Sequence, residues 1–342
     1  MSSPAEREAA RGVTDKTLAE SARSGDRRAL ARLLTEVENR TAAGEAALKT
    51  LYPLAGAAHL VGVTGAPGSG KSTLVAALTG AARAAGRPVG VIAIDPSSPI
   101  TGGAILGDRV RMQIHATDDD VFIRSMASRG HSGGLAASTV AAAAVMDAAG
   151  FGLIFIETVG TGQSEVEVAA IADTTVVVQS PEMGDEVQAI KAGLLEVADI
   201  VVVNKADRPG ADRAAAQLRA MLTVGAASDK AAIAAGRPRP KRPEVMLASA
   251  LSGKGVPELL AALDRRAPSP GSRVADGAAI KRAEAQVAGI VAERIAEQLQ
   301  SPDRAAQREE TMRAVARHEI DPYTAADRLL SSIKAGDSPG TR

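Results

Sequence analysis

The segment from residue 60 to residue 78, LVGVTGAPGSGKSTLVAAL, constrains the fold of this chain more than any other. An apolar run leads into a glycine-rich turn, and the turn leads into a run rich in alanine and leucine, which predicts a strand, a loop and a helix. The turn matches the pattern G-x-x-x-x-G-K-[ST], in which backbone N–H groups and the helix N-terminus bind phosphate oxygens. The residues expected to bind phosphate are Gly65, Ala66, Pro67, Gly68, Ser69, Gly70, Lys71, Ser72 and Thr73.

Two side chains of this segment are expected to carry chemistry. Lys71 would reach the β- and γ-phosphates as a mobile point charge, and the Ser72 hydroxyl would bind Mg²⁺. The alternative is a glycine-rich turn between a strand and a helix that binds nothing. The apolar strand before the turn and the helix after it argue against that alternative.

Further apolar, β-branched runs follow at residues 89–95, 152–158, 174–180 and 198–207, and each ends in polar residues. Helical stretches separate them, for example 135–149 and 186–197. Near-continuous apolar strands between helices predict an α/β fold of the P-loop NTPase type, with a mostly parallel sheet covered by helices on both faces. Ligands of such sheets bind beyond the carboxyl ends of the strands, where the polar residues lie.

We expect three regions along the chain. Residues 1–55 form an N-terminal helical extension, residues 56–266 the P-loop domain, and residues 267–342 a C-terminal helical region. Within the domain, residues 226–243 are expected to form a basic surface loop before a last strand at 244–250. The C-terminal region carries an apolar stripe that needs a covering surface, for which we favour a second copy of the chain: Ile280, Ala283, Val287, Ile290, Val291, Ile295 and Leu299.

Composition excludes several classes of function. The chain has 40 basic and 40 acidic residues and no cysteine. Balanced charge gives no general attraction to nucleic acid or to an anionic membrane, and no apolar run approaches the roughly 20 residues that span a bilayer. The N-terminus does not have the pattern of a signal peptide. We therefore expect a soluble, cytoplasmic protein without disulfides or thiolate metal sites.

The sequence Asn204-Lys205-Ala206-Asp207, directly after an apolar run, predicts guanine recognition. An aspartate here accepts hydrogen bonds from N1–H and N2–H₂ of guanine, whereas adenine would leave the carboxylate unpaired. Taken alone, the pattern can also be a helix-capping aspartate after a loop. The residues expected to bind the base are Asn204, Lys205 and Asp207, together with Ser249, Ala250 and Leu251, which offer a backbone N–H to the guanine oxygen.

Three carboxylates are candidates for Mg²⁺ binding and for orienting the attacking water: Asp95, Asp108 and Glu157. Glu157 ends an apolar strand, where P-loop GTPases carry an aspartate. For Asp95 and Asp108, a role as helix cap or turn residue remains open. The predicted catalytic set is Lys71, Asp95, Asp108 and Glu157, and the predicted metal set is Ser72, Asp95, Asp108 and Glu157. Thr161 stands where small GTPases carry a water-positioning glutamine, which predicts slow intrinsic hydrolysis.

These motifs in this order resemble the MeaB/ArgK family, the methylmalonyl-CoA mutase-associated GTPases that are also known as LAO/AO transport ATPases. The resemblance runs through GAPGSGKST, ETVGTGQSE at 157–165, PEMGDEVQAIKAG at 181–193 and DPYT at 321–324, and covers roughly residues 15–335. Unlike many members, this chain lacks tryptophan in its C-terminal helices.

The resemblance implies a GTPase that binds GTP, GDP and Mg²⁺ and forms a homodimer. It also implies that this GTPase gates adenosylcobalamin delivery to an acyl-CoA mutase and protects the mutase. The resemblance assigns switch segments at 95–112, 157–170 and 181–193, with Lys191 relaying the nucleotide state. Because the chain lacks the D-x-H-x-x-G pattern, cobalamin is expected on the partner. Two alternatives are an ATP-using kinase or ATPase of a basic amino-acid transport system, and a GTPase that delivers a metal ion.

Overall fold

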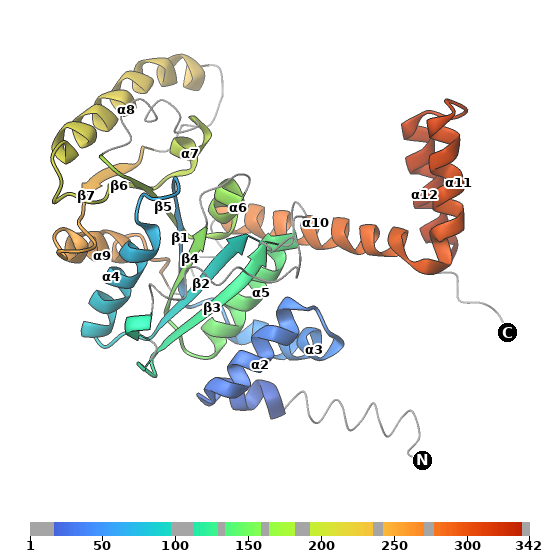
Figure 1. Ribbon diagram of the computed structural model, residues 1–342, viewed down its shortest axis with the longest axis horizontal. Helices are drawn as coiled ribbons and strands as arrows, with labels where there is room; N and C mark the ends of the chain where they lie inside the picture. Colours follow the sequence, from blue (N-terminus) through green and yellow to red (C-terminus); the bar gives the residue numbers. More distant parts are fainter. Residues whose placement is uncertain are drawn as a thin grey trace. The chain divides into compact units, whose positions relative to one another are not determined.

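A computed structural model describes residues 17–96, 113–115, 117–128, 134–158, 164–181, 192–234, 242–269 and 277–336 of the chain (Figure 1). Its centre is a seven-stranded sheet in the order β3-β2-β4-β1-β5-β6-β7. Every pair of neighbouring strands is parallel. The strands are β1 (His59–Thr64), β2 (Val89–Pro96), β3 (Val121–Ser128), β4 (Leu153–Thr158), β5 (Thr174–Gln179), β6 (Ile200–Val203) and β7 (Glu244–Leu247).

Helices cover both faces of the sheet. On one face, α4 (Lys71–Ala84) and α9 (Val256–Asp264) pack on alternate residues of the strands, including Val176 and Val178 of β5. On the other face lie α5 (Gly134–Ala148), α6 (Ser164–Ile171), α7 (Ala192–Val197) and α8 (Ala211–Ala234). Both faces of each central strand are thus buried, which explains why these strands read as unbroken β-branched runs. The predicted α/β fold with a parallel sheet is confirmed.

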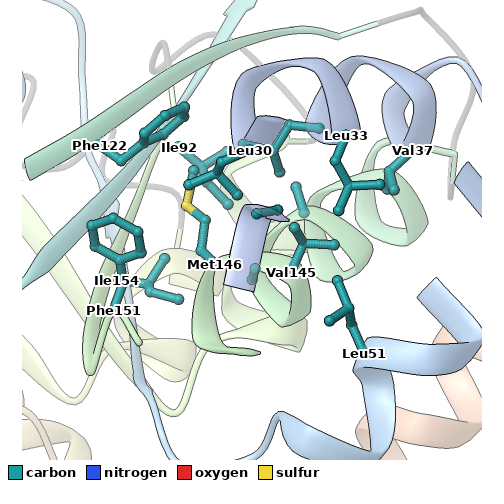
Figure 2. Packing of buried hydrophobic residues seen from close by; sticks show 14 of the residues in the cluster. Leu30, Leu33, Val37, Leu51, Ile92, Phe122, Val145, Met146, Phe151 and Ile154 are labelled. Carbon is teal, nitrogen blue, oxygen red and sulfur yellow. The ribbon is translucent and has the colours of Figure 1, made fainter. Parts of the chain in front are cut away.

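The N-terminal helices α2 (Arg27–Glu38) and α3 (Ala42–Leu51) belong to the same core as the sheet. Leu33 is fully buried, and Figure 2 shows it beside Val145 of α5. Asp26 begins α2 by accepting hydrogen bonds from the backbone N–H groups of residues 28 and 29, at 2.8 and 3.1 Å. Of the N-terminal helical extension expected at residues 1–55, the structure describes residue 17 onward, and these residues are largely helical.

Two elements differ from the sequence-based expectations. Strand β3 was not predicted, because Arg124 and Ser125 interrupt its apolar pattern and only one neighbour, β2, pairs with it. The surface loop expected from residue 226 is wrong in its first half, since α8 continues to Ala234. The run AASDKAAIA is rich in alanine, which has the highest helix propensity, and this local preference extends the helix.

The chain divides into two compact units, Met1–Arg282 and Ala283–Arg342, and the division falls within α10 (Gly277–Gln300). In the second unit, the short helix η5 (Pro302–Arg304) precedes α11 (Ala305–Ala316) and α12 (Pro322–Gly336). Thr311 and Ala314 of α11 are buried, as is Ala325 of α12. Asp321 caps α12 by accepting hydrogen bonds from two backbone N–H groups and from the Thr324 hydroxyl.

The apolar stripe of α10 is largely exposed in the single chain. Val287 and Val291 are 60 % and 49 % exposed, and Ile280 and Ile290 are also exposed. Among the described residues, no helix combines the length and the apolar character needed to cross a bilayer.

Candidate nucleotide-binding site

Within a row of five neighbouring strands, the carboxyl ends of four bring predicted site residues to one edge of the sheet. The strands β4, β1, β5, β6 and β7 are adjacent and parallel, so the segments that follow them lie side by side. The phosphate loop follows β1, Glu157 lies at the end of β4, Asn204 follows β6, and Ser249 follows β7. This edge is where ligands of parallel α/β sheets bind.

The glycines of the phosphate loop are required by its backbone path. Gly65 has a φ of 137°, and a Cβ there would lie 2.2 Å from the carbonyl oxygen of Val178. Gly70 has a φ of 90°, and a Cβ there would lie 2.4 Å from the Asn204 side-chain nitrogen. Any other L-residue at these positions would be strained and would collide with a neighbour. The loop therefore lies tightly against the ends of β5 and β6.

Lys71 is the first residue of α4, and its side chain is hydrogen-bonded to the first residues of the phosphate loop. Its Nζ donates hydrogen bonds to the carbonyl oxygens of Gly65, at 2.8 Å, and of Ala66, at 3.1 Å. The residue is 6 % exposed. These two bonds curve the lysine back over the loop, so its charge lies where phosphate groups would meet the backbone N–H groups and the N-terminus of α4.

Ser72 and Glu157 form a buried hydroxyl–carboxylate pair. The Ser72 Oγ donates to Oε1 of Glu157 over 2.5 Å, and both residues are at most 5 % exposed. A hydroxyl and a carboxylate in contact, beside a phosphate loop, form a donor set of the kind that Mg²⁺ takes together with substrate phosphates and waters. The oxygen chemistry of this pair therefore fits the predicted ion. No cluster of three or more histidine, cysteine, aspartate or glutamate side chains able to hold a metal occurs in the described ranges.

Of the other two predicted carboxylates, only Asp95 lies in the described part of the chain. Asp95 lies near the carboxyl end of β2, in register with Ala127 of β3, on the same edge of the sheet. Asp108 lies outside the described residues, as do Thr161, Lys191 and most of the three switch segments.

Asn204 connects the phosphate loop to the loop that follows β7. Its side-chain nitrogen donates to the carbonyl oxygens of Ser69, at 3.0 Å, and Gly70, at 3.3 Å. Its side-chain oxygen accepts a hydrogen bond from the N–H of Ala250, at 3.2 Å. The sequence indicated Asn204 as a base-binding residue. The structure adds that it is 2 % exposed and braces two loops against each other.

Asp207 and Ser249 form the second pair of the site. The Ser249 Oγ donates to Oδ1 of Asp207 over 2.5 Å. This hydrogen bond, together with backbone hydrogen bonding, lowers the pKa of the Asp207 carboxyl below its usual value. The carboxylate is consequently charged at neutral pH, the state needed to accept hydrogen bonds from guanine. Lys205 adopts a left-handed backbone, with φ 57°, and Leu251 is 81 % exposed.

Ser180 is among the buried polar residues at this edge that did not enter the predicted site. Ser180 follows β5 and is 4 % exposed. The polar ending of the run TTVVVQS is the only signal in the sequence that pointed to it, and the other three apolar runs named above end in polar residues as well.

Comparison with known proteins gives consistent results. The sequence profile described as "Methylmalonyl Co-A mutase-associated GTPase MeaB" matches residues 30–308. A protein of Pyrococcus abyssi, named as a candidate GTPase, is 47% identical over 321 residues, covering 93% of this chain and 97% of its own. The "Methylmalonic aciduria type A homolog, mitochondrial" of Caenorhabditis elegans is 35% identical over 257 residues, covering 70% of this chain and 62% of its own.

Among solved structures, the crystal structure of an LAO/AO transport system kinase aligns with a TM-score of 0.64 and 27% identity. The alignment covers 94% of this chain and 98% of that one. The phosphate loop, the N-K-x-D segment and the parallel sheet thus occur in a chain that matches the family profile over most of its length. By these criteria the chain belongs to the family of methylmalonyl-CoA mutase-associated GTPases, MeaB.

Proposed function

We propose that this chain hydrolyses GTP and, through its nucleotide state, gates adenosylcobalamin delivery to an acyl-CoA mutase that it also protects. The observation that carries GTP as the nucleotide is the charged Asp207 carboxylate held by Ser249 beside the phosphate loop. The family description and the name of the nematode relative support methylmalonyl-CoA mutase or a close relative as the partner.

In this proposal each residue of the site has a defined task. The N–H groups of the loop and Lys71 bind the phosphates, while Asp207 accepts the two N–H donors of guanine. Asn204 keeps the base-binding and phosphate-binding loops at a constant separation. Ser72 and Glu157, with Asp95 and Asp108 as further candidates, would hold Mg²⁺, which supplies neutralisation of charge on the phosphate oxygens. Glu157 keeps Ser72 oriented through their hydrogen bond.

The partners follow from the same proposal. Adenosylcobalamin would be bound by the mutase, and this chain would act as a homodimer in the cytoplasm. The exposed Val287, Ile290 and Val291 of α10 support the dimer, because contiguous apolar faces of soluble proteins are generally covered. Hydrolysis by the isolated protein would be slow, since Thr161 cannot orient water as a glutamine does, and it would accelerate when the mutase binds.

The test is steady-state hydrolysis of GTP and of ATP by the purified full chain, with Mg²⁺, with and without a methylmalonyl-CoA or isobutyryl-CoA mutase. We expect turnover of GTP alone, accelerated by one mutase. Equal turnover of ATP would instead support the ATP-using kinase or ATPase of an amino-acid transport system. GTP turnover that no mutase changes would refute the chaperone part and leave the GTPase part standing.

A further inference from the structure

Two buried hydroxyl groups near the phosphate loop have no hydrogen-bond partner within the described part of the chain. They are the Oγ atoms of Ser69, which is 0 % exposed, and of Ser180, which is 4 % exposed. Buried hydroxyls in native proteins are nearly always hydrogen-bonded, because an unpaired one retains the full cost of leaving water. Two such groups at one end of a sheet therefore need an explanation.

The topology places Ser180 and Asn204 side by side on the same face of the sheet. Gln179 pairs with Val203, and the N–H of Asn204 donates to the Gln179 carbonyl at 2.8 Å, so Ser180 and Asn204 are neighbours across the two strands. Val178 and Val202 both face α4. Side chains alternate along strands, so Ser180 and Asn204, two residues further on, face α4 as well.

Asn204, the neighbour of Ser180, also contacts Ser69. Its side-chain nitrogen donates to the carbonyl oxygens of Ser69 and Gly70, so this part of the phosphate loop lies over the ends of β5 and β6. The close approach of Gly65 to the Val178 carbonyl fixes the other end of the loop above the same strand. Ser180 thus lies beneath a loop whose own buried hydroxyl, that of Ser69, also lacks a partner.

We propose that Ser180 is a positioning residue for the phosphate loop: its hydroxyl hydrogen-bonds to that of Ser69 when a nucleotide binds. A hydroxyl both donates and accepts, so a single contact of this kind satisfies both groups. In the nucleotide-free protein the two unpaired hydroxyls raise the free energy, and their hydrogen bond in the nucleotide-bound protein relieves that cost. Nucleotide affinity therefore includes the formation of this bond. The inference rests on the proposed nucleotide binding and adds a residue that no phosphate-loop pattern contains.

The experiment is a double-mutant cycle on the full chain, freed of nucleotide with EDTA. The variants are Ser180→Ala, Ser69→Ala and the double substitution, and the dissociation constants are those of fluorescent GDP and GTP analogues. Each single substitution should weaken binding about fivefold, the worth of one neutral hydrogen bond. The double variant should also be about fivefold weaker, rather than the twenty-five-fold that independent effects would give.

Melting temperatures of the nucleotide-free proteins give a second readout that a merely structural serine would move in the opposite direction. Ser180→Ala should melt about 2 °C higher than the parent, because it removes an unpaired buried hydroxyl. Thr139→Val is the matched control. Thr139 is 0 % exposed in α5, on the opposite face from α4, and its hydroxyl also has no partner among the residues described. Its loss should raise the melting temperature and leave nucleotide affinity unchanged.

Three results would overturn the inference: unchanged affinity in Ser180→Ala, independent effects in the double variant, or a lower melting temperature of nucleotide-free Ser180→Ala. Any of them with normal guanine-nucleotide binding by the parent would leave the proposed function intact. A parent that binds only adenine nucleotides would refute GTP as the ligand. The same cycle, run with ADP, would still decide the role of Ser180, because the phosphate loop binds phosphates and not the base.

Discussion

Replacement of Asp207 by asparagine should exchange the base that this protein accepts. Guanine offers two N–H donors to the Asp207 carboxylate, which Ser249 holds in place over 2.5 Å. Asparagine offers one oxygen and one NH₂ group, so one of the two contacts becomes donor against donor. That contact is lost, and the remaining one no longer has a charged acceptor. Since each hydrogen bond to a charged group contributes roughly a factor of ten or more, GTP affinity should fall about a hundredfold.

Xanthine carries a carbonyl oxygen where guanine carries its amino group, and that oxygen accepts from the NH₂ group of asparagine. Asp207→Asn should therefore bind xanthosine triphosphate more tightly than GTP, whereas the parent should show the reverse order. The assay is competition of GTP and xanthosine triphosphate against a fluorescent GDP analogue. Asp264→Asn is the control, since this carboxylate pairs with Arg87 instead. It should leave both affinities unchanged.

The pH dependence of the parent provides a second check. The Ser249 hydrogen bond lowers the pKa of Asp207, so the carboxylate is charged at and above the ordinary carboxyl pKa of about 4. Because its pKa is lowered, the Asp207 carboxylate makes its full contribution to GTP binding above the ordinary carboxyl pKa. That contribution is lost only as the pH falls through the lowered pKa. The titration of Asp207 should thus cause no change in GTP affinity above about pH 5.

GTP binding by Asp207→Asn within twofold of the parent, without any gain for xanthosine triphosphate, would refute the reasoning.

Three further predictions concern the phosphate loop, the metal pair and the core. Lys71→Met keeps the apolar stem and removes the buried ammonium, so GTP turnover should fall at least about a hundredfold; near-normal turnover would contradict the role of Lys71. Glu157→Gln preserves a hydrogen-bond acceptor for Ser72 but removes the charge, so half-maximal turnover should need about tenfold more Mg²⁺, and an unchanged titration would exclude this role. Leu33→Ala opens a cavity between α2 and α5, so the free energy of unfolding in urea should fall by about 3 kcal/mol; a change below about 1 kcal/mol would mean that α2 is not part of the core.

Much of the fold could be predicted because its signals are local. The strands β1, β2, β4, β5 and β6 are buried on both faces, so each is a run of β-branched residues that identifies it without knowledge of its neighbours. Strand β3 escaped prediction because Arg124, which pairs with Glu38 of α2, breaks the pattern. The position of that arginine makes sense only once α2 packs beside the strand.

The candidate site likewise divides into features that the sequence predicts and contacts that only the tertiary structure shows. The sequence alone predicted the chemistry proposed for its parts: the glycines and Lys71 for phosphate, Asp207 for guanine, and carboxylates at strand ends for a metal ion. Their contacts were decided by the tertiary structure. Ser72 meets Glu157 across 85 residues of chain, and Asn204 meets Ser69 across 135. Such pairs depend on strand order and register, which no local pattern specifies. The unpaired hydroxyls of Ser69 and Ser180 likewise became visible only when β5 and the phosphate loop lay together.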